Sequence, residues 1–468
     1  MSRLPRTFFE KPLPFRALLI DIRRRVASSD GVGGRVIACA TSATLGIALT
    51  VACFYPGYMS SDSVDQLGQA RSGVFNDWHP PLMSFVWRFT DQIIPGPLGM
   101  LILNNVLFWS GIALICYRCL EESAAPAIAV LGLLPPVFGQ LSTVWKDVAF
   151  GASMIFAFAL LLHAQLTRSK AAWIFSFLPL FYALGVRHNS APAVLVLMFY
   201  SGWVYARTFR GLGSWRTPFV VGALSFVLLL AGVSLLNRKL VGDRQGHPLQ
   251  QILFHDLTAI SLAEGKVLLP GWVHGNRSAP TLDELRRMYT ADGLDPLLWG
   301  NPAINFETTG DPTALATLHQ AWRAAVYQYS GAYVRHRFRV FKSILGFNHT
   351  CHAYQEGIEE NSFKIQVRSS KINTTVMQAL ATLRNTLFFR PWIFVSAIIV
   401  MLIASLRLPP KARIPLLMLG ISALLYEGAY LVIGPGCDFR LSWYTVLAAL
   451  VMPLLMVGTP SFANPTTN

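Results

Sequence analysis

Five short clusters of ionisable residues stand out in this sequence because each one borders a long apolar run. They are Ser61-Asp62-Ser63-Val64-Asp65, Asp77-Trp78-His79-Pro80-Pro81, Trp145-Lys146-Asp147, Arg187-His188-Asn189 and Asp438-Phe439-Arg440. Ionisable groups near hydrocarbon are costly, so they usually pair with one another or line a polar cavity. We therefore expect the five clusters to meet in one shared site.

Carboxylates beside several cations suit the transfer of a group from a phosphate donor to a hydroxyl or an amine. A carboxylate takes the proton of the acceptor, and cations stabilise the charge that develops on the departing phosphate. Asp62 is the candidate base, and Asp65, three residues later and so on the same helix face, is its partner. The candidate substrate-binding residues are His79, Lys146, Asp147, Arg187, His188 and Arg440.

Each candidate also has a purely structural interpretation, which the sequence leaves open. Asp62 is equally suited to capping a short helix, and His79 to a structural hydrogen bond in a stiff turn before two prolines. Lys146 and Asp147 are adjacent, which is also typical of a local ion pair at the start of a span. The convergence of the five clusters on one face of the membrane favours a shared functional site over these structural interpretations.

The composition requires that lipid cover part of the chain. Of 468 residues, 53% are hydrophobic and 13% are charged, whereas soluble domains carry about 25% charged residues. A bilayer crossing takes about 20 apolar residues. It must be helical here, because its backbone N–H and C=O groups have to hydrogen-bond with one another in the absence of water. We predict an all-α polytopic membrane protein with about ten spans, near 36–56, 99–117, 125–142, 148–166, 171–186, 191–206, 217–237, 387–406, 414–434 and 443–458.

The distribution of basic residues predicts the orientation of these spans. With the N-terminus in the cytoplasm, the inner segments hold 17 Lys and Arg residues and the short outer loops hold five. This is the positive-inside pattern of membrane proteins. The net charge of +15 therefore reflects topology and attraction to anionic membrane lipids, and we expect no nucleic-acid partner.

The same pattern divides the chain into four parts. Residues 1–35 form a basic cytoplasmic segment, 36–237 hold seven spans and an outer loop at 57–98, 238–386 form a long outer region, and 387–468 hold the last three spans. The first apolar run follows 35 residues without a clear cleavage site, which is typical of a retained anchor. All five polar clusters then lie on the outer side.

The long region 238–386 is too long to be structureless, so we expect a cap of short helices. Its best helix is 312–345, with Asp311 as N-cap and Gly346 at its end. Aromatic residues and five cations along it predict a position at the membrane interface. Those cations are Arg323, Arg335, Arg337, Arg339 and Lys342.

Other polar residues of the outer side have weaker patterns. His255-Asp256 is typical either of a polar contact or of a packed core histidine. The tract Asn348-His349-Thr350-Cys351-His352 resembles a metal-binding tract only weakly. Cys351 and Cys437 both fall where oxidation is permitted, so they are either a bridge that braces Arg440 or two unrelated small residues.

The segment from Tyr58 to Gln66, with Gly73 and then Asp77-Trp78-His79-Pro80-Pro81-Leu82, resembles the first outer loop of GT-C-fold membrane glycosyltransferases. Those include the lipid A aminoarabinose transferases and the protein O-mannosyltransferases. In that family an early Asp, often followed by Glu, acts in catalysis, and Asp62 stands at its position. This chain has Ser63 in place of the Glu and Asn76 in place of the Gly before Asp77-Trp78.

The resemblance implies a donor, a location and a reaction. The donor is a polyprenyl-phosphate sugar, the catalytic face is periplasmic, and a divalent metal is a candidate cofactor. The Trp145-Lys146-Asp147 and Arg187-His188-Asn189 segments are similar to those of uncharacterised bacterial members, which implies a bacterial inner membrane. A transporter or flippase, and a polymerase or ligase of lipid-linked saccharides, remain the alternatives to an inverting transferase.

The predicted orientation can be tested with two reporter fusions. A reporter at Gly213 follows the sixth predicted span and should lie in the cytoplasm, whereas one at Gly293 lies in the long region and should lie outside. Activity of paired cytoplasmic and periplasmic reporters at each position measures this. Both fusions reporting the same side would contradict the topology and the shared outer site.

Overall fold

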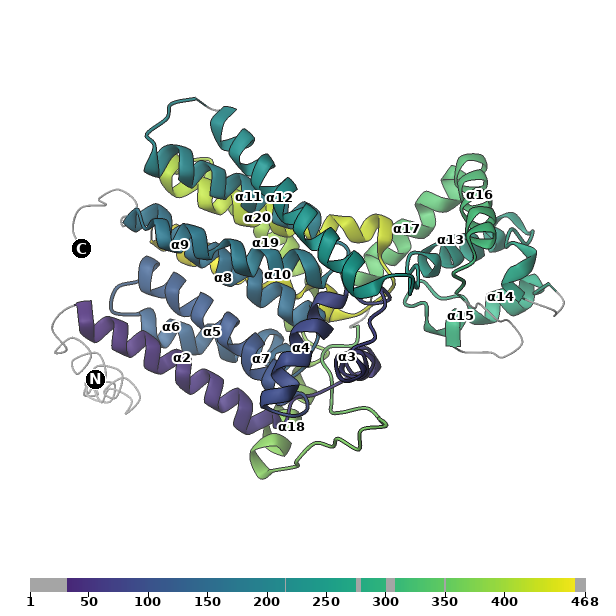
Figure 1. Ribbon diagram of the computed structural model, residues 1–468, viewed down its shortest axis with the longest axis horizontal. Helices are drawn as coiled ribbons and strands as arrows, with labels where there is room; N and C mark the ends of the chain where they lie inside the picture. Colours follow the sequence, from purple (N-terminus) through teal and green to yellow (C-terminus); the bar gives the residue numbers. More distant parts are fainter. Residues whose placement is uncertain (1–31, 215, 275–278, 300–307, 349–350, 459–468) are drawn as a thin grey trace, which may run out of the picture.

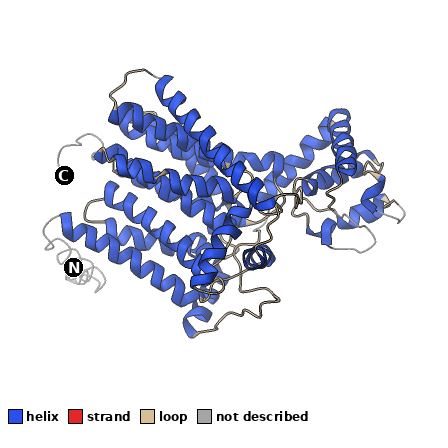
Figure 2. Cartoon of the chain, in the orientation of Figure 1, coloured by secondary structure: helices blue, strands red, loops and turns tan. Residues whose placement is uncertain are grey.

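The computed structural model describes residues 32–214, 216–274, 279–299, 308–348 and 351–458. In these ranges the chain is α-helical, with four isolated β-bridges and no strand (Figure 2). The bundle helices run side by side, and a smaller group of helices projects beyond one end of them (Figure 1). The described chain is thus a multi-pass membrane protein with a helical cap, as the sequence predicts. Of the predicted cytoplasmic segment 1–35, residues 1–31 lie outside these ranges.

Six helical stretches are long and apolar enough to cross a membrane. They are α2 (Val32–Phe54), α5 (Leu98–Cys119), α8 (Lys146–Thr167), α12 (Arg216–Val241), α20 (Pro410–Ile433) and the stretch Phe439–Val457 that contains α21 (Trp443–Val457). A seventh is a broken pair, α6 (Ala124–Leu133) and α7 (Pro135–Leu141), bent by 72°. Pro135 and Pro136 explain the break, because proline has no N–H for the preceding turn.

The other three predicted spans coincide with shorter helices. These are α9 (Lys170–Phe175) with α10 (Phe177–Val186), α11 (Ala191–Trp203) with the π-helical turn Val204–Phe209, and α19 (Pro391–Ser405). Each predicted apolar segment is therefore helical. The structure identifies six spans by length, or seven with the bent pair, against the ten that hydropathy predicts.

Helix α8 forms the centre of the bundle. Inside the protein, 83% of its most apolar stretch is buried, compared with 11% for α12 at the periphery. Small residues allow its neighbours to approach closely: a Cβ on Gly151 would lie 2.6 Å from the Trp443 ring, and one on Gly111 of α5 would lie 3.0 Å from the Phe156 backbone. The first residue of this central helix is Lys146, so the backbone that carries this side chain belongs to a rigid element.

The cap consists of α13 (Gln250–Glu264), α14 (Leu282–Met288), α15 (Asp295–Trp299), α16 (Pro312–Gln328) and α17 (Ser330–Ile344). It has its own apolar core, to which α13 contributes Phe254 and Leu257 and α16 contributes Leu318. Asp311 and Pro312 begin α16 as predicted. The prediction of one helix over 312–345 is wrong, because Tyr329 at φ −121° and ψ 43° leaves the helical region.

A buried polar cluster at the base of the cap corrects another expectation. Arg337 does not reach lipid phosphate, since its side chain is 3% exposed and its Nη2 lies 2.6 Å from an Asp256 carboxylate oxygen. His336 lies 3.2 Å from the same carboxylate, beside the buried His255. His255-Asp256 is therefore part of the packed interior of the cap.

The long region 238–386 contains more than the cap. Residues 351–370 run as an irregular strap back across the end of the bundle, and α18 (Lys371–Leu383) packs beside α2. The Asn373 amide donates hydrogen bonds to the Cys53 carbonyl and to the Tyr58 hydroxyl. This part of the region thus belongs to the bundle rather than to the cap.

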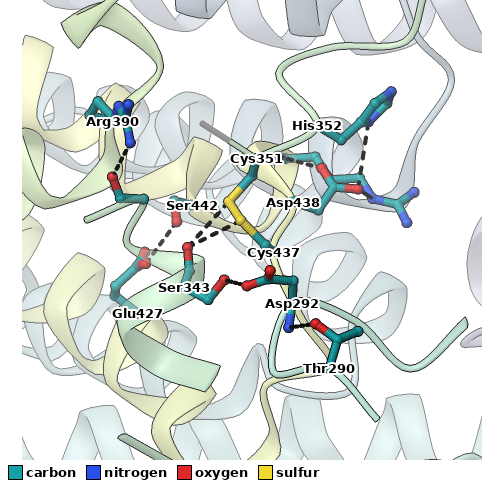
Figure 3. Close-up of a disulfide and its surroundings, with 12 residues drawn as sticks. Thr290, Asp292, Ser343, Cys351, His352, Arg390, Glu427, Cys437, Asp438 and Ser442 are labelled. Carbon is teal, nitrogen blue, oxygen red and sulfur yellow. Dashed lines mark hydrogen bonds and ion pairs between the residues drawn. A yellow bond between two sulfur atoms is a disulfide. The ribbon is translucent and has the colours of Figure 1, made fainter. Parts of the chain in front are cut away.

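A disulfide between Cys351 and Cys437 ties the strap to the loop before α21 (Figure 3). The two Cα atoms are 5.1 Å apart. Beside the bridge the strap pairs with the same loop, because the Phe439 N–H donates to the His352 carbonyl at 3.0 Å. Further along, the Glu359 N–H donates to the Met59 carbonyl. The strap therefore connects the segment before α3 (Ser61–Ser72) to the segment that carries Arg440.

Candidate functional site

A cavity of about 640 Å³ lies between the cap and the near end of the bundle. All five clusters contribute to its lining, through Asp62, Asp77, Trp78, His79, Lys146, Arg187, His188, Asn189, Asp438 and Arg440. The cavity has the size of a small-molecule site, for which about 300–1,000 Å³ is common. The structure thus brings together side chains that are up to 378 positions apart in the chain.

Asp62 stands in the first turn of α3, and the segment before this helix is held on both sides. Tyr58 pairs with Thr143, and Met59 pairs with Ile358 of the strap. The N-cap is Ser60, whose side chain makes no capping bond, and the free Ser61 N–H is taken by the Glu359 carboxylate at 2.8 Å. Asp62 is therefore not the cap of its helix, and its carboxylate faces the cavity.

Three basic side chains surround the Asp62 carboxylate. Its Oδ2 lies 3.1 Å from Arg440 Nη1 and 3.5 Å from Lys146 Nζ, and its Oδ1 lies 3.7 Å from His79 Nε2. Burial alone raises the pKa of a carboxyl, but the charges of Lys146 and Arg440 outweigh it here and hold the pKa of Asp62 well below its usual range. In this state Asp62 is ionised and a weak base.

His79 connects Lys146 to Asp62 as a neutral imidazole. Burial, together with the Lys146 charge, lowers the pKa of His79 to about 3. Its Nδ1 lies 2.6 Å from Lys146 Nζ, and because ammonium only donates, this nitrogen accepts. The ring proton then resides on Nε2, on the side of Asp62. His79 therefore orients Lys146 and does not add charge.

Arg440 is held from two further directions. Its guanidinium stacks on the Trp145 ring at 4.7 Å, an arrangement that favours arginine. Its Nε lies 2.9 Å from Asp438 Oδ2, and His352 Nδ1 lies 3.8 Å from the same oxygen. Figure 3 shows Asp438 and His352 next to the disulfide. The strap and its bridge thus fix the loop that presents Arg440 to Asp62.

Asp147 pairs with Arg187 rather than with its neighbour Lys146. Arg187 Nη1 lies 2.6 Å from Asp147 Oδ1, and the two side chains are 9% and 1% exposed. The same guanidinium donates to the Tyr430 hydroxyl of α20. The interpretation of Lys146-Asp147 as a local pair is therefore wrong. Arg187 lines the cavity with its charge already compensated, which leaves Lys146 and Arg440 as the cations nearest Asp62.

Asp65 does not share the cavity with Asp62. Its Oδ2 accepts from the Gln69 amide at 2.7 Å, and the residue is not part of the cavity wall. The two carboxylates are on one helix, as predicted, but only the first points inward. His188 lines the cavity near Trp78.

Several residues of the site were not predicted as site residues. Tyr430 and His319 lie in a membrane helix and in the cap, where nothing in the local pattern marks them. Trp145 and Asp77 belong to predicted clusters, but their contacts with Arg440 and with the Gly246 N–H could not be read from spacing. Glu359 acts through the α3 backbone, far away in sequence.

The described residues do not fit a divalent metal. In that part of the chain no three His, Cys, Asp or Glu side chains are grouped as metal ligands. Asp62, the residue that the resemblance would assign to a metal, instead has Lys146 and Arg440 against its oxygens. Hard cations need several oxygen ligands, so no step is assigned to a metal.

No family model, curated protein or solved structure matches this chain.

The buried Arg187–Asp147 pair gives a prediction about stability. Asp147→Asn removes one partner and leaves the guanidinium charge buried, which should cost about 3–5 kcal/mol. Replacing both residues, as Asp147→Leu with Arg187→Leu, removes the uncompensated charge and should recover most of this loss. Unfolding of purified protein in detergent measures both, and the exposed Asp283→Asn serves as a control with little effect. Unchanged stability of Asp147→Asn would contradict the pair's structural role.

Proposed function

We propose that this protein is a membrane glycosyltransferase that moves a sugar from a polyprenyl-phosphate donor to an acceptor on the periplasmic face of a bacterial inner membrane. The observation that carries the proposal is the contact of one carboxylate, Asp62, with two cations, Lys146 and Arg440, in one cavity at the end of the bundle. The resemblance of the Tyr58–Gln66 segment to GT-C transferases supports it.

The distribution of charge supports the proposed side of the membrane. Helix α2 begins and α5 ends at the end of the bundle opposite the cap (Figure 1). Near these helix ends Arg35 donates to the carbonyls of Tyr117 and Leu120, and Arg118 donates to His163. These cations belong to the short segments that predict a cytoplasmic side. The cavity is at the other end, which supports a periplasmic site with ten spans, the shorter helices included.

Donor binding would rearrange the charges around Asp62. A phosphate that enters the cavity takes Lys146 and Arg440 as its partners, since both are already oriented toward one point. Asp62 then loses the charges that depress its pKa, and its basicity rises. The carboxylate becomes a competent base only when the donor is present, which protects the donor from attack by stray water.

The proposed transfer uses this arrangement of one base and two cations. The acceptor hydroxyl gives its proton to an Asp62 oxygen while its own oxygen forms the bond to the anomeric carbon. The bond from that carbon to the phosphate oxygen breaks, and the electron pair leaves with the phosphate held by Lys146 and Arg440. Base and leaving group flank one carbon, so the configuration at that carbon inverts.

One observation favours the transporter alternative. Transporters often contain broken helices, and α6 and α7 form a span bent by 72°. In this chain, however, the break leads through Ser142–Trp145 to Lys146 at the cavity. The charged groups of the cavity also gather at one end of the bundle. The bend thus serves to present Lys146, and the transferase is the better supported function.

The decisive variant is Asp62→Asn, which keeps the size of the side chain but cannot take up the acceptor proton. Turnover should fall by about 10²–10⁴-fold without loss of folding. Asp65→Asn is the matched control and should retain nearly full turnover, because Asp65 lies outside the cavity wall. Transfer of labelled sugar from a polyprenyl-phosphate donor in proteoliposomes measures both.

Lys146→Ala and Arg440→Ala should instead raise the donor concentration needed for half-maximal rate, because each leaves phosphate charge unpaired. Full turnover by Asp62→Asn would remove Asp62 from the base role. Equal effects of Asp62→Asn and Asp65→Asn would show that the cavity is not where transfer occurs.

A further inference from the structure

The cavity has two chemically different sides. On the bundle side are Lys146, Arg187 and Arg440, the only Lys and Arg residues among the described residues of the wall. The opposite side is formed by the start of α13, the loop before α15, the start of α16 and the Asp77-Trp78 pair. Asp77 belongs to this second side because its carboxylate accepts from the Gly246 N–H. We call the second side the cap wall.

The cap wall carries the carboxylates of Asp77 and Asp295, and Asp295 is exposed. No Lys or Arg side chain lines this wall in the described part of the cavity. The nearby hydrogen-bonding groups are the imidazoles of His247 and His319. An acceptor that carries phosphate or carboxylate would meet like charges here, and such juxtapositions weaken binding.

The cap wall also provides a flat apolar surface. Trp78 is partly exposed and lines the cavity between Asp77 and His79. A sugar ring offers an apolar face to an aromatic ring and hydroxyl groups around its edge. Carboxylates are strong acceptors for such hydroxyls, since O–H···O⁻ bonds are among the stronger hydrogen bonds. The combination suits a neutral ring with many hydroxyls better than a lone cation.

A second hollow continues from the cap wall across the outer face of α16. His319 lines both, and Gln320, Arg323 and Tyr327 line the second hollow alone. Tyr327 is 91% exposed, so the face of its ring is accessible to a ligand. A ligand that stacks on Trp78 and extends past His319 would cover this ring. The continuity of the two hollows therefore favours a ligand of more than one ring.

We propose that the cap wall is a binding site for a neutral oligosaccharide, which is the acceptor in the transfer reaction. The terminal sugar stacks on Trp78 with its hydroxyls on Asp77 and Asp295, and the following sugars pass His319 to Tyr327. The acceptor role rests on the proposed function, but the binding of the saccharide does not. Donor phosphate and neutral acceptor are thus separated by the charge of the two walls.

The test uses the full-length protein in nanodiscs with saturating inorganic phosphate, which occupies Lys146 and Arg440 so that only the cap wall is left to discriminate. Saturation-transfer NMR compares neutral oligosaccharides with the same compounds bearing a phosphate or an amine. The neutral compounds should bind at least about tenfold more tightly than the phosphorylated ones, a difference of about 1.4 kcal/mol. Equal or tighter binding of the phosphorylated compounds, binding of the amine compounds alone, or no binding at all would overturn the proposal.

Three variants assign the binding to the cap wall. Asp295→Lys should reduce the discrimination against phosphorylated compounds about tenfold, whereas Asp283→Lys, an exposed cap residue away from the cavity, should leave it unchanged. Tyr327→Ala should weaken the binding of trisaccharides and leave the binding of monosaccharides unaffected. Identical behaviour of the two lysine variants would contradict the site. Saccharide binding without any transfer from a polyprenyl-phosphate donor would defeat the proposed function and leave this site standing.

Discussion

The contact of Asp62 with Lys146 and Arg440 is the interaction on which the rest of the site depends. A carboxylate close to hydrocarbon is stable only when it is compensated, and these two cations compensate it from different parts of the chain. Lys146 begins the central helix of the bundle, and Arg440 precedes the last one. The pairing therefore joins the segment after the first membrane helix to the start of the central helix and to the segment before the last one.

The surrounding structure keeps that contact in place. His79 holds Lys146, and Trp145 and Asp438 hold Arg440. The strap contributes at two points, through Glu359 at the start of α3 and through the Cys351–Cys437 bridge beside Asp438. His79, Asp438 and Cys437 are part of the cavity wall, whereas Trp145 and Glu359 support it from outside the lining. These contacts fix Lys146 and Arg440 before a substrate binds. Such preorganisation lowers the free energy needed to reach the transition state.

Much of this arrangement could be predicted from the sequence, and the remainder has identifiable causes. Hydropathy located each apolar helix, and the one-sided clusters predicted a common cavity, which the structure contains. The pairing of Asp147 with Arg187 instead of Lys146 depends on how α8 rotates against α10, which sequence spacing does not specify. The break at Tyr329 and the burial of Arg337 result from the core of the cap, where tertiary contacts override local helix propensity. Asp65 lies on the predicted helix but bonds to Gln69.

The central claim is that Asp62 competes with the donor phosphate for Lys146 and Arg440. The direct measurement is the affinity of Asp62→Asn and of the unchanged protein for an unreactive polyprenyl phosphate, with chelator present. Loss of the competing carboxylate should tighten binding, by about tenfold or 1.4 kcal/mol, even though turnover is lost. Weaker binding by Asp62→Asn would contradict the account, because it would mean that Asp62 itself holds the donor.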